Sequence, residues 1–531
     1  MMMMRRNLSG PDGLIVVICM LQIAAVLAYL LRNGRLSIVP IYDDVVYLID
    51  GMERLAALDA GGLWGLLASF TTSVAHAPLL SLLGAFGLLV SGGAVWGAYL
   101  MNAVWVFAAL ALSWLLMQQL SPWSRFGIAL AMLAAPMFGY AVAEFRPDVG
   151  WGLLVGFSAA LLATCDLRRI EPPTALWLGA LLGICVLAKP SASPATVVVL
   201  VVAYLAQLPA TMLPDWRASI GPILRRAALI SMAAIAVLLP YLITSGNHVL
   251  SYILNVMLSE REVWETKASF SGHLMYYINK GTAPLMLGWF WYLGLPILVT
   301  CVLALVWRRS WPELQRFAGL LAALAVAYVI PSLSPVKSLL IGSLVYGSFI
   351  ATVVYATAMI LRSVDVSPTI LVIAGVVIYA YNWTPRAGMI HRDAEVFRAT
   401  DSANRTVSPI VIDKLEAIPP TNGRPTVLVT VPGPVYAGTM DFLSRQGGVV
   451  GEFISAYTWS TWEMFADGIA SADILIAQEP GMVGQALGFN FPSVAFQDRI
   501  IETLNSDASF VGAPAYTDPD GRSVWVFSRR R

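Results

Sequence analysis

Residues 13–31 read GLIVVICMLQIAAVLAYLL, and none of these side chains is charged. A helix needs about 20 mainly apolar residues to cross the hydrocarbon core of a bilayer, so this run predicts a membrane-spanning helix. The run follows Arg5 and Arg6, as the apolar part of a signal peptide would, but it ends at Arg32 without a small-residue cleavage site. We therefore expect a retained anchor helix.

The composition extends this prediction to most of the chain. Of the 531 residues, 58% are hydrophobic and only 12% are charged, whereas a soluble domain carries about 25% charged residues. This balance indicates a polytopic membrane protein and excludes a large soluble enzyme. The net charge of +1 gives no indication of a nucleic-acid partner. The four cysteines lie in apolar runs and show neither metal-binding nor disulfide spacing.

Apolar segments recur along the first 383 residues. After the first run they lie near 77–91, 94–117, 124–143, 149–165, 174–189, 193–209, 227–245, 284–307, 317–331, 338–361 and 369–383. Arginines occupy the short connections between these segments, and the positive-inside rule places such arginines in the cytoplasm. They all satisfy the rule if 77–91 does not cross. We therefore expect a polytopic α-helical protein with about 11 to 12 transmembrane helices, in which 77–91 is a re-entrant or surface helix.

This topology places four parts of the chain on the outer face of the membrane. They are the loop 32–76, the turn 144–148, the loop 246–282 and the C-terminal region. If 77–91 crosses instead, every later loop inverts and the arginine pairs move outside, against the rule.

The composition changes near residue 384, where charged residues, Gly and Pro become frequent and long apolar runs stop. Short buried strands are predicted at 426–430, 472–477 and 523–527, with helices at 436–446, 461–470 and 494–505. About 145 residues is a usual size for one domain. We expect a transmembrane domain over 1–383 and an extracytoplasmic α/β domain over 384–531.

Two adjacent carboxylates, Asp43 and Asp44, follow the first span, with Arg32 and Arg35 between the span and the pair. Acidic side chains near a membrane are costly, so a functional site is one interpretation. The alternative is a solvated loop that begins a helix, because Asp stabilises helix N-termini. The local sequence leaves both interpretations open.

The predicted topology gathers further ionisable side chains on the same face. Its acids include Glu144, Asp148 and Glu260, its bases Arg146, Lys189, Arg261, Lys280 and Lys337, and its histidines His76, His248 and His273. Each has a simpler explanation alone, such as snorkelling for a lysine at a span end. Together they suit one chemistry: a carboxylate takes a proton from a hydroxyl, and fixed cations stabilise a phosphate leaving group.

The order of several short motifs resembles the membrane-embedded GT-C glycosyltransferases. The likeness is to the branch of protein O-mannosyltransferases and lipid A aminoarabinose transferases. The motifs, in order, are Asp43-Asp44 with Tyr47, His76-Ala77-Pro78-Leu79, Arg146-Pro147-Asp148, Lys189-Pro190, His273 with Tyr276-Tyr277, and Lys337 before a late span. The family often has Glu at the second acid and Lys at the position of His76. The resemblance covers roughly 40–350 and leaves 384–531 without a recognised motif.

The resemblance implies a function for these residues. Asp43 would be the general base of an inverting transfer from a polyprenyl-phosphate sugar to a glycan, lipid or protein acceptor, and Asp44 would orient it. Contacts to the donor phosphate would come from Arg146, Lys189, Lys337 and Arg261. The site would be shaped by Tyr47, His76, Asp148, His273 and Tyr276. The resemblance also allows a divalent metal, although the sequence shows no clean ligand spacing. The reaction would take place at the outer face of the cytoplasmic membrane.

Two other functions are compatible with a polytopic chain. A lipid or sugar transporter or flippase would carry ionisable residues near the bilayer midplane and show paired repeats, and the sequence shows neither. A membrane-anchored binding protein would have its function in 384–531. There the aromatic residues Tyr457, Trp459 and Trp462 could stack on sugar rings, although such clusters are more often core.

Overall fold

The computed structural model describes the chain in six stretches, which are 9–212, 216–279, 282–382, 391–419, 424–482 and 490–530. The chain divides into two compact units. The membrane unit comprises Met1–Ala28, Asp50–Ile253 and Lys267–Gly388, and the α/β unit comprises Tyr29–Ile49, Leu254–Thr266 and Met389–Arg531. The predicted domain boundary at 383/384 lies outside the described residues.

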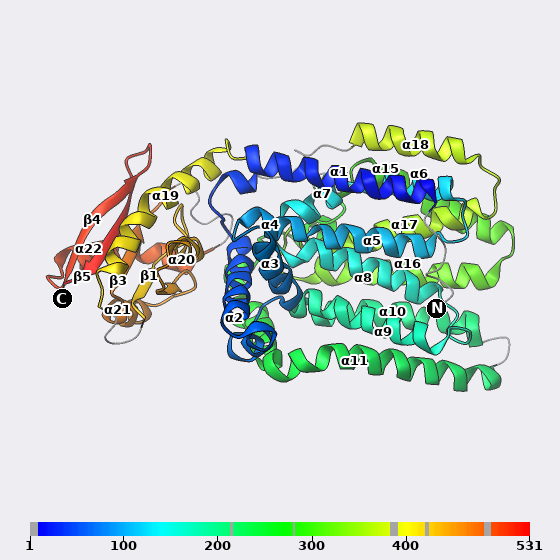
Figure 1. Cartoon of the computed structure of the whole chain (residues 1–531), viewed down its shortest axis with the longest axis horizontal. Helices are drawn as coiled ribbons and strands as arrows, with labels where there is room; N and C mark the ends of the chain where they lie inside the picture. Colours follow the sequence, from blue (N-terminus) through cyan, green and yellow to red (C-terminus); the bar gives the residue numbers. More distant parts are fainter. Residues whose placement is uncertain are drawn as a thin grey trace. The chain divides into compact units, whose positions relative to one another are not determined.

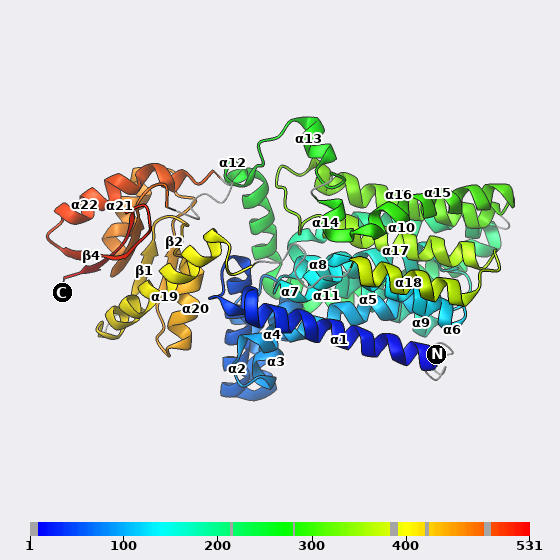
Figure 2. The same ribbon diagram turned by 90° about the horizontal axis from the view of Figure 1, so that it is seen from above.

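Long apolar helices build the membrane unit and run roughly parallel in both ribbon views (Figures 1 and 2). The main ones are α1 (Gly10–Asn33), α5 (Ala103–Leu116), α8 (Pro147–Thr164), α9 (Pro172–Ala188), α10 (Ser193–Met212), α11 (Trp216–Leu254), α15 (Trp289–Trp307), α16 (Trp311–Leu333), α17 (Ser343–Leu361) and α18 (Pro368–Asn382). Short helices α4 (Val95–Met101), α6 (Pro122–Leu133) and α7 (Pro136–Ala143) complete the bundle. The predicted polytopic helical fold is confirmed.

The centre of the bundle is the contact between α8 and α17. Their backbones approach closely because glycines face each other, as is common between membrane helices. A Cβ atom on Gly152 would lie 2.2 Å from the carbonyl oxygen of Ser343, and one on Gly347 would lie 2.1 Å from the carbonyl oxygen of Gly152. Only glycine fits at these two positions, so the sequence itself sets how closely α8 and α17 pack.

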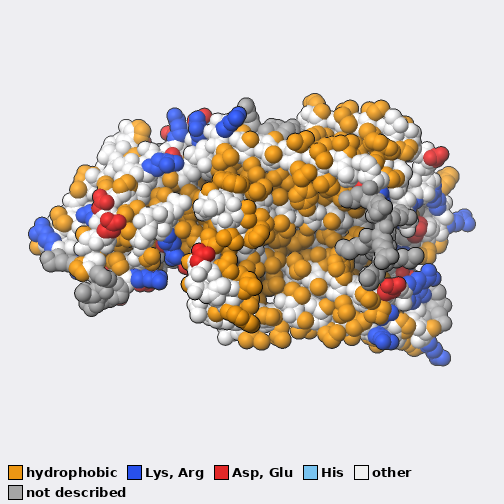
Figure 3. Space-filling view, viewed as in Figure 1, with side chains coloured by type: hydrophobic (Ala, Val, Ile, Leu, Met, Phe, Trp, Pro, Cys, Tyr) orange, Lys and Arg blue, Asp and Glu red, His pale blue; other side chains and the backbone are white. Residues whose placement is uncertain are grey.

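The outer surface of the bundle is apolar. Side chains such as Leu21, Ile243 and Trp307 are 65%, 74% and 89% exposed, which suits contact with lipid rather than water. Figure 3 shows hydrophobic side chains over the visible face of the helices, with Lys and Arg gathered toward one end of the bundle. A cluster of basic residues at one end of the helices is what the positive-inside rule predicts.

Among the described residues, fewer helices than the expected 11 to 12 qualify as spans by length and composition. Seven helices among the described residues are long and apolar enough to span a membrane, or nine if each of two bent pairs is one span. The helix α3 (Pro78–Val90) has 13 residues, so it is about 20 Å long and shorter than the roughly 30 Å hydrocarbon core. Its length agrees with the expectation that 77–91 does not cross by itself.

The two expected outer loops contain helices. Residues 43–72 form α2 (Asp43–Thr72), which kinks at Gly61 and Gly62, where Gly62 has a φ of 60°. Arg54 is fully buried and donates hydrogen bonds across the kink to the carbonyl oxygens of Ser69 and Ser73, both at 2.5 Å. In 246–282, α11 continues to Leu254, followed by a π-helix (Asn255–Ser259), α12 (Arg261–Trp264) and α13 (Phe270–Met275).

The α/β unit is a mixed five-stranded sheet between helices, in the order β2-β1-β3-β5-β4. Its strands are β1 (Thr426–Val429), β2 (Glu452–Ser455), β3 (Ile474–Gln478), β4 (Phe510–Thr517) and β5 (Ser523–Arg529). The strand β1 pairs in parallel with β2 and β3, while β5 pairs antiparallel with β3 and β4. The sheet lies beside α19 (Glu395–Glu416), α20 (Ala437–Gln446), α21 (Trp462–Ser471) and α22 (Gln497–Ser506).

The core of this unit has two layers, one on each face of the sheet, because side chains along a strand alternate between the two faces. Val427 and Val429 pack with residues of α19 and α20, and Leu428 between them packs with residues of α21 and α22. Successive side chains of a strand point to opposite faces of the sheet, so β1 contributes to both layers. The three predicted strands and three predicted helices are confirmed within a few residues. The edge strands β2 and β4 and the helix α19 were not predicted.

Candidate functional site

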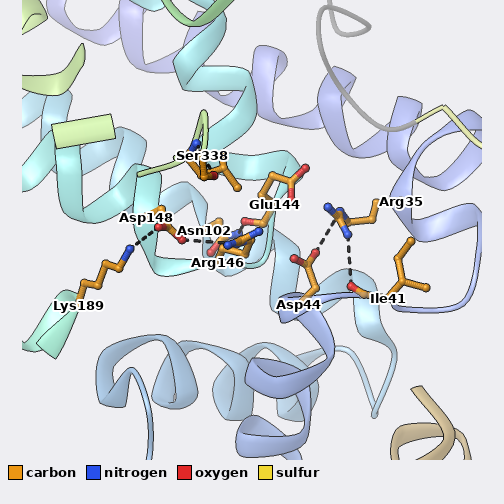
Figure 4. Close-up of polar contacts among 10 residues, drawn as sticks. Arg35, Ile41, Asp44, Asn102, Glu144, Arg146, Asp148, Lys189 and Ser338 are labelled. Carbon is orange, nitrogen blue, oxygen red and sulfur yellow. Dashed lines mark hydrogen bonds and ion pairs between the residues drawn. The ribbon is translucent and has the colours of Figure 1, made fainter. Parts of the chain in front are cut away.

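The acid pair stands at the start of α2, and the two carboxylates have different surroundings. Asp44 is fully buried and Arg35 is 5% exposed, and the Nε of Arg35 lies 3.2 Å from the Oδ2 of Asp44 (Figure 4). Arg35 also donates to the carbonyl oxygen of Ile41 at 3.4 Å. Asp43 is exposed. A buried carboxylate is stable only when it is paired, and Arg35 is the cationic partner of Asp44.

The segment before the acid pair is held by the helices of the α/β unit. The amide of Val39 donates to the Oδ1 of Asp401 at 2.7 Å, and the hydroxyl of Thr439 donates to the carbonyl oxygen of Pro40 at 2.8 Å. Tyr42, which has a φ of 59°, lies edge-on to Tyr436 with ring centroids 5.5 Å apart. These contacts come from α19, α20 and the residue before α20, so residues more than 350 positions later in the sequence hold the segment that leads to Asp43.

An aromatic cluster also belongs to the α/β unit. Trp264 lies edge-on to Tyr457 at 5.8 Å and to Phe491 at 6.1 Å, and Tyr457 lies 5.4 Å from Phe491. The indole of Trp264 donates to the Oε2 of Glu260 at 3.0 Å. Burial raises the pKa of Tyr457 to about 12, and the nearby carboxylates of Glu260 and Asp43 contribute to this shift.

A second charged cluster lies in the membrane unit at the N-terminus of α8. Asp148 is 2% exposed and accepts a hydrogen bond from the Nζ of Lys189, while the Nε of Arg146 lies 3.5 Å from its Oδ2 (Figure 4). Arg146 precedes Pro147, and Lys189 follows the last residue of α9. Nearby, the amide of Asn102 donates to the carbonyl oxygen of Glu144 at 2.9 Å. Two partly exposed cations, Arg146 and Lys189, therefore contact one buried carboxylate, and the buried Glu144 lies close by.

His76 lines a cavity in the membrane unit. The cavity measures about 80 Å³ and is lined by Val74, His76, Ser191, Tyr241, His248, Val249 and Tyr252. The hydroxyl of Tyr241 donates to the carbonyl oxygen of Ala75 at 2.8 Å, and the ring of His76 lies 4.5 Å from that of Tyr252. Ser191 follows Lys189 by two residues, at the bend of 105° between α9 and the next helix. The same bend therefore places Lys189 in contact with Asp148 and Ser191 in the wall of the cavity.

Asp50 lies on α2 and was not predicted. Its carboxylate accepts a hydrogen bond from the hydroxyl of Ser81 at 3.2 Å. Burial raises the pKa of Asp50 to about 6. The positive charge of Arg54 lowers this pKa and the negative charge of Glu53 raises it, but both effects are smaller than that of burial. No motif pointed to Asp50, because its burial depends on the packing of α2 against α3.

The predicted phosphate ligand Lys337 caps a helix. It is 6% exposed, and its Nζ donates to the carbonyl oxygens of Pro331, Ser332 and Ser334, each at 2.7 Å. These carbonyls stand at the end of α16, where cations stabilise unpaired helix carbonyls. An ammonium group has three donors, so a phosphate contact would require one of these bonds to be exchanged.

The remaining predicted residues are spread over both units. Tyr47 is buried in α2 of the α/β unit. Arg261 in the same unit is exposed and lies 3.5 Å from Glu265. In the membrane unit, His273 lies on α13. Tyr276 packs edge-on against Tyr277, with ring centroids 5.0 Å apart. The ring of Tyr277 in turn lies 5.5 Å from the Nζ of Lys337.

The described residues do not fit a metal centre. Among them, no group of three or more His, Cys, Asp or Glu side chains is arranged to hold a metal ion. Asp44 and Asp148, the most buried of the predicted acids, already have arginine or lysine partners. The divalent metal that the resemblance allows therefore has no evident ligand set in this part of the chain.

Known proteins resemble the chain in structure more than in sequence. The crystal structure of ArnT from Cupriavidus metallidurans in the apo state matches with a TM-score of 0.58 and 15% identity, covering 98% of each chain. ArnT bound to undecaprenyl phosphate matches with a TM-score of 0.55 and 12% identity, also covering 98% of each chain. No protein-family model and no curated protein matches the sequence. The chain therefore has the GT-C fold that its motifs predicted.

Proposed function

We propose that this chain, which has the GT-C fold, transfers a sugar from a polyprenyl-phosphate donor to an acceptor hydroxyl. The observation that carries the proposal is that the two adjacent acids have different surroundings. Asp44 is buried and paired with Arg35, whereas Asp43, in the same helix turn, is exposed. An exposed carboxylate on a rigid helix can reach a substrate hydroxyl, as a general base must. In support, one structure with this fold, ArnT, was solved with undecaprenyl phosphate.

The reaction is a single displacement at the anomeric carbon. Asp43 takes the proton of the acceptor hydroxyl as its oxygen forms a bond to that carbon. The bond between the anomeric carbon and the phosphate oxygen breaks, and its electron pair leaves with the polyprenyl phosphate. The configuration inverts because attack comes from the face opposite the leaving group. Asp44, held by Arg35, positions the first turn of α2 on which Asp43 stands.

Arg146 and Lys189 are the proposed ligands of the donor phosphate. Both are partly exposed, at 20% and 17% of their side chains, although both contact Asp148. A guanidinium and an ammonium group held in fixed positions suit a phosphate that gains negative charge as the sugar leaves. Asp148 holds the two cations in place. The proposal keeps the roles predicted from the motifs, in which Lys337 and Arg261 also contact the donor phosphate. The site-shaping residues are Tyr47, His76, His273 and Tyr276.

The proposed site faces the outside of the cytoplasmic membrane. The support is the distribution of arginines in short connections, which the positive-inside rule assigns to the cytoplasm. On that topology the loop with Asp43 and the C-terminal domain lie on the opposite side. A donor with a polyprenyl tail would then present its phosphate at the membrane surface. The acceptor would be a glycan, a lipid or a protein.

The test is sugar transfer by the purified protein in lipid nanodiscs, without an ion gradient. The wild type should consume an undecaprenyl-phosphate sugar in the presence of cell-envelope acceptors. Asp43→Asn should lose at least 100-fold in rate, since general-base catalysis contributes about 10²–10⁴-fold. Asp467→Asn, which changes an exposed carboxylate on α21, is the matched control and should keep full activity.

Two results would count against the proposal. Normal transfer by Asp43→Asn would remove the base assignment. Movement of the lipid or sugar across proteoliposomes without product formation would indicate a transporter instead. Activity that disappears on treatment with EDTA and returns with a divalent cation would show that a metal is required.

A further inference from the structure

Three separate segments of the α/β unit meet at an aromatic cluster. They are the segment 254–266 with Trp264, the loop after β2 with Tyr457, and Phe491. Trp264 and Tyr457 are both half-buried, and their rings are nearly perpendicular, at 75°. Phe491 is 8% exposed and lies edge-on to both rings. Phe491 is therefore the buried member of the cluster, and the rings of Trp264 and Tyr457 are partly exposed.

Two carboxylates lie beside this cluster. Glu260 accepts the hydrogen bond of the Trp264 indole, and both Glu260 and Asp43 are close enough to Tyr457 to affect its titration. Partly exposed ring faces flanked by carboxylates suit a binding site, where a few polar groups orient a ligand on an apolar surface.

The neighbouring tryptophans have different partners. Trp459 packs against Phe465 at 5.3 Å and belongs to the core of the α/β unit. Trp462 lies under the guanidinium of Arg499 at 3.8 Å. Tyr457 is the aromatic residue of the stretch 457–462 whose ring packs against Trp264 of the segment 254–266.

We propose that Trp264 and Tyr457 form the acceptor subsite beside Asp43 and that the acceptor they hold is a carbohydrate ring. A sugar ring has apolar C–H faces that pack on aromatic rings and hydroxyls that donate to carboxylates. Glu260 would accept from one hydroxyl while Asp43 takes the proton of another. The inference rests on the proposed function and specifies the acceptor. A purely structural role, in which the rings only attach 254–266 to the domain, is the alternative that the test must separate.

The test measures transfer of labelled hexose or pentose from undecaprenyl phosphate to a cell-envelope extract, using the full-length protein in nanodiscs. For Tyr457→Leu and Trp264→Leu, we expect the extract concentration for half-maximal transfer to rise about tenfold, the effect of losing one aromatic contact. The donor concentration for half-maximal transfer should stay unchanged. Tyr457→Phe keeps the ring and should behave as the wild type. Trp462→Leu, on the same domain, is the matched control. The label should appear in the glycan or glycolipid fraction.

The outcomes distinguish the two proposals. If the wild type does not consume the donor, the proposed function fails. If it does, but the leucine variants keep their acceptor dependence, the subsite is wrong. Leucine variants with a lower melting temperature and equal losses toward donor and acceptor would show a structural role. Label in the protein fraction would also overturn the carbohydrate assignment.

Discussion

The guanidinium of Arg35 and the carboxylate of Asp44 form an ion pair of 3.2 Å in which both side chains are buried. The two residues belong to one short stretch, with Arg35 in a 3-10 helix (Arg35–Ser37) and Asp44 in the first turn of α2. A buried charge without its partner is costly, so each residue depends on the other. The pair leaves Asp43 as the exposed member of the two acids.

Arg35→Met should destabilise the α/β unit by about 3–5 kcal/mol, because it leaves the Asp44 carboxylate buried and unpaired. The double variant Arg35→Met/Asp44→Leu removes both charges and should recover most of this loss. Thermal unfolding of the detergent-solubilised protein measures both effects. A double variant no more stable than Arg35→Met would contradict the pairing.

Lys189→Met should raise the donor concentration for half-maximal transfer by about 10- to 100-fold, since one hydrogen bond to a charged group contributes about 1.5–3 kcal/mol. The acceptor dependence should not change. Steady-state kinetics with an undecaprenyl-phosphate sugar provide the measurement. The control Lys414→Met removes a lysine bonded to Ser528 in the α/β unit and should leave the donor dependence unaltered. Equal behaviour of the two variants would exclude Lys189 as a phosphate ligand.

Lys337→Met separates helix capping from phosphate binding. Loss of its three bonds to the carbonyls at the end of α16 should lower the melting temperature of the protein, since each such bond to a charged donor is worth about 1.5–3 kcal/mol. If the ammonium only caps the helix, the donor dependence of the folded fraction stays normal. A tenfold or larger rise in that dependence, with unchanged stability, would restore the predicted phosphate role.

Gly152→Ala should disrupt the contact between α8 and α17. The new methyl group would lie 2.2 Å from the carbonyl oxygen of Ser343, and such overpacking costs about 1–3 kcal/mol. In Gly13→Ala, on α1, the methyl group meets no atom within 4 Å, so this variant should be as stable as the wild type or slightly more stable. Thermal unfolding compares the two. An unchanged melting temperature for Gly152→Ala would mean that α8 and α17 can move apart without loss of stability.

The stability of the protein should depend on the protonation of Asp50. Burial raises the pKa of its carboxyl from 3.8 to about 6 in the folded state. The folded protein therefore binds this proton more tightly than the unfolded chain does, and the corresponding stabilisation is lost as the pH rises from about 4 through 6. Asp50→Asn cannot titrate. Its melting temperature, relative to that of the wild type, should rise between pH 4 and pH 7, and a constant difference would refute the shift.

Much of the architecture could be predicted because its signals are local. Runs such as 13–31 and 338–361 predicted helices that the structure contains as α1 and α17, and 426–430 and 472–477 predicted strands that became β1 and β3. The missed elements lack such signals. The edge strand β4 is mostly exposed, so it has no buried apolar run. In α19 the buried residues Ala403, Val407, Val411 and Leu415 are separated by polar residues.

The candidate site divides in the same way. The sequence alone determined the membrane-helix fold, the α/β domain and the set of motifs, because hydrophobic length, strand alternation and motif order are properties of short segments. Only the tertiary structure decided that Asp44 is buried on Arg35, that Lys337 caps α16 and that Trp264 packs against Tyr457 beside Asp43. The physical reason is that burial and the choice of partner depend on segments brought together by folding. Trp264 and Tyr457, nearly 200 residues apart in the chain, show it most clearly.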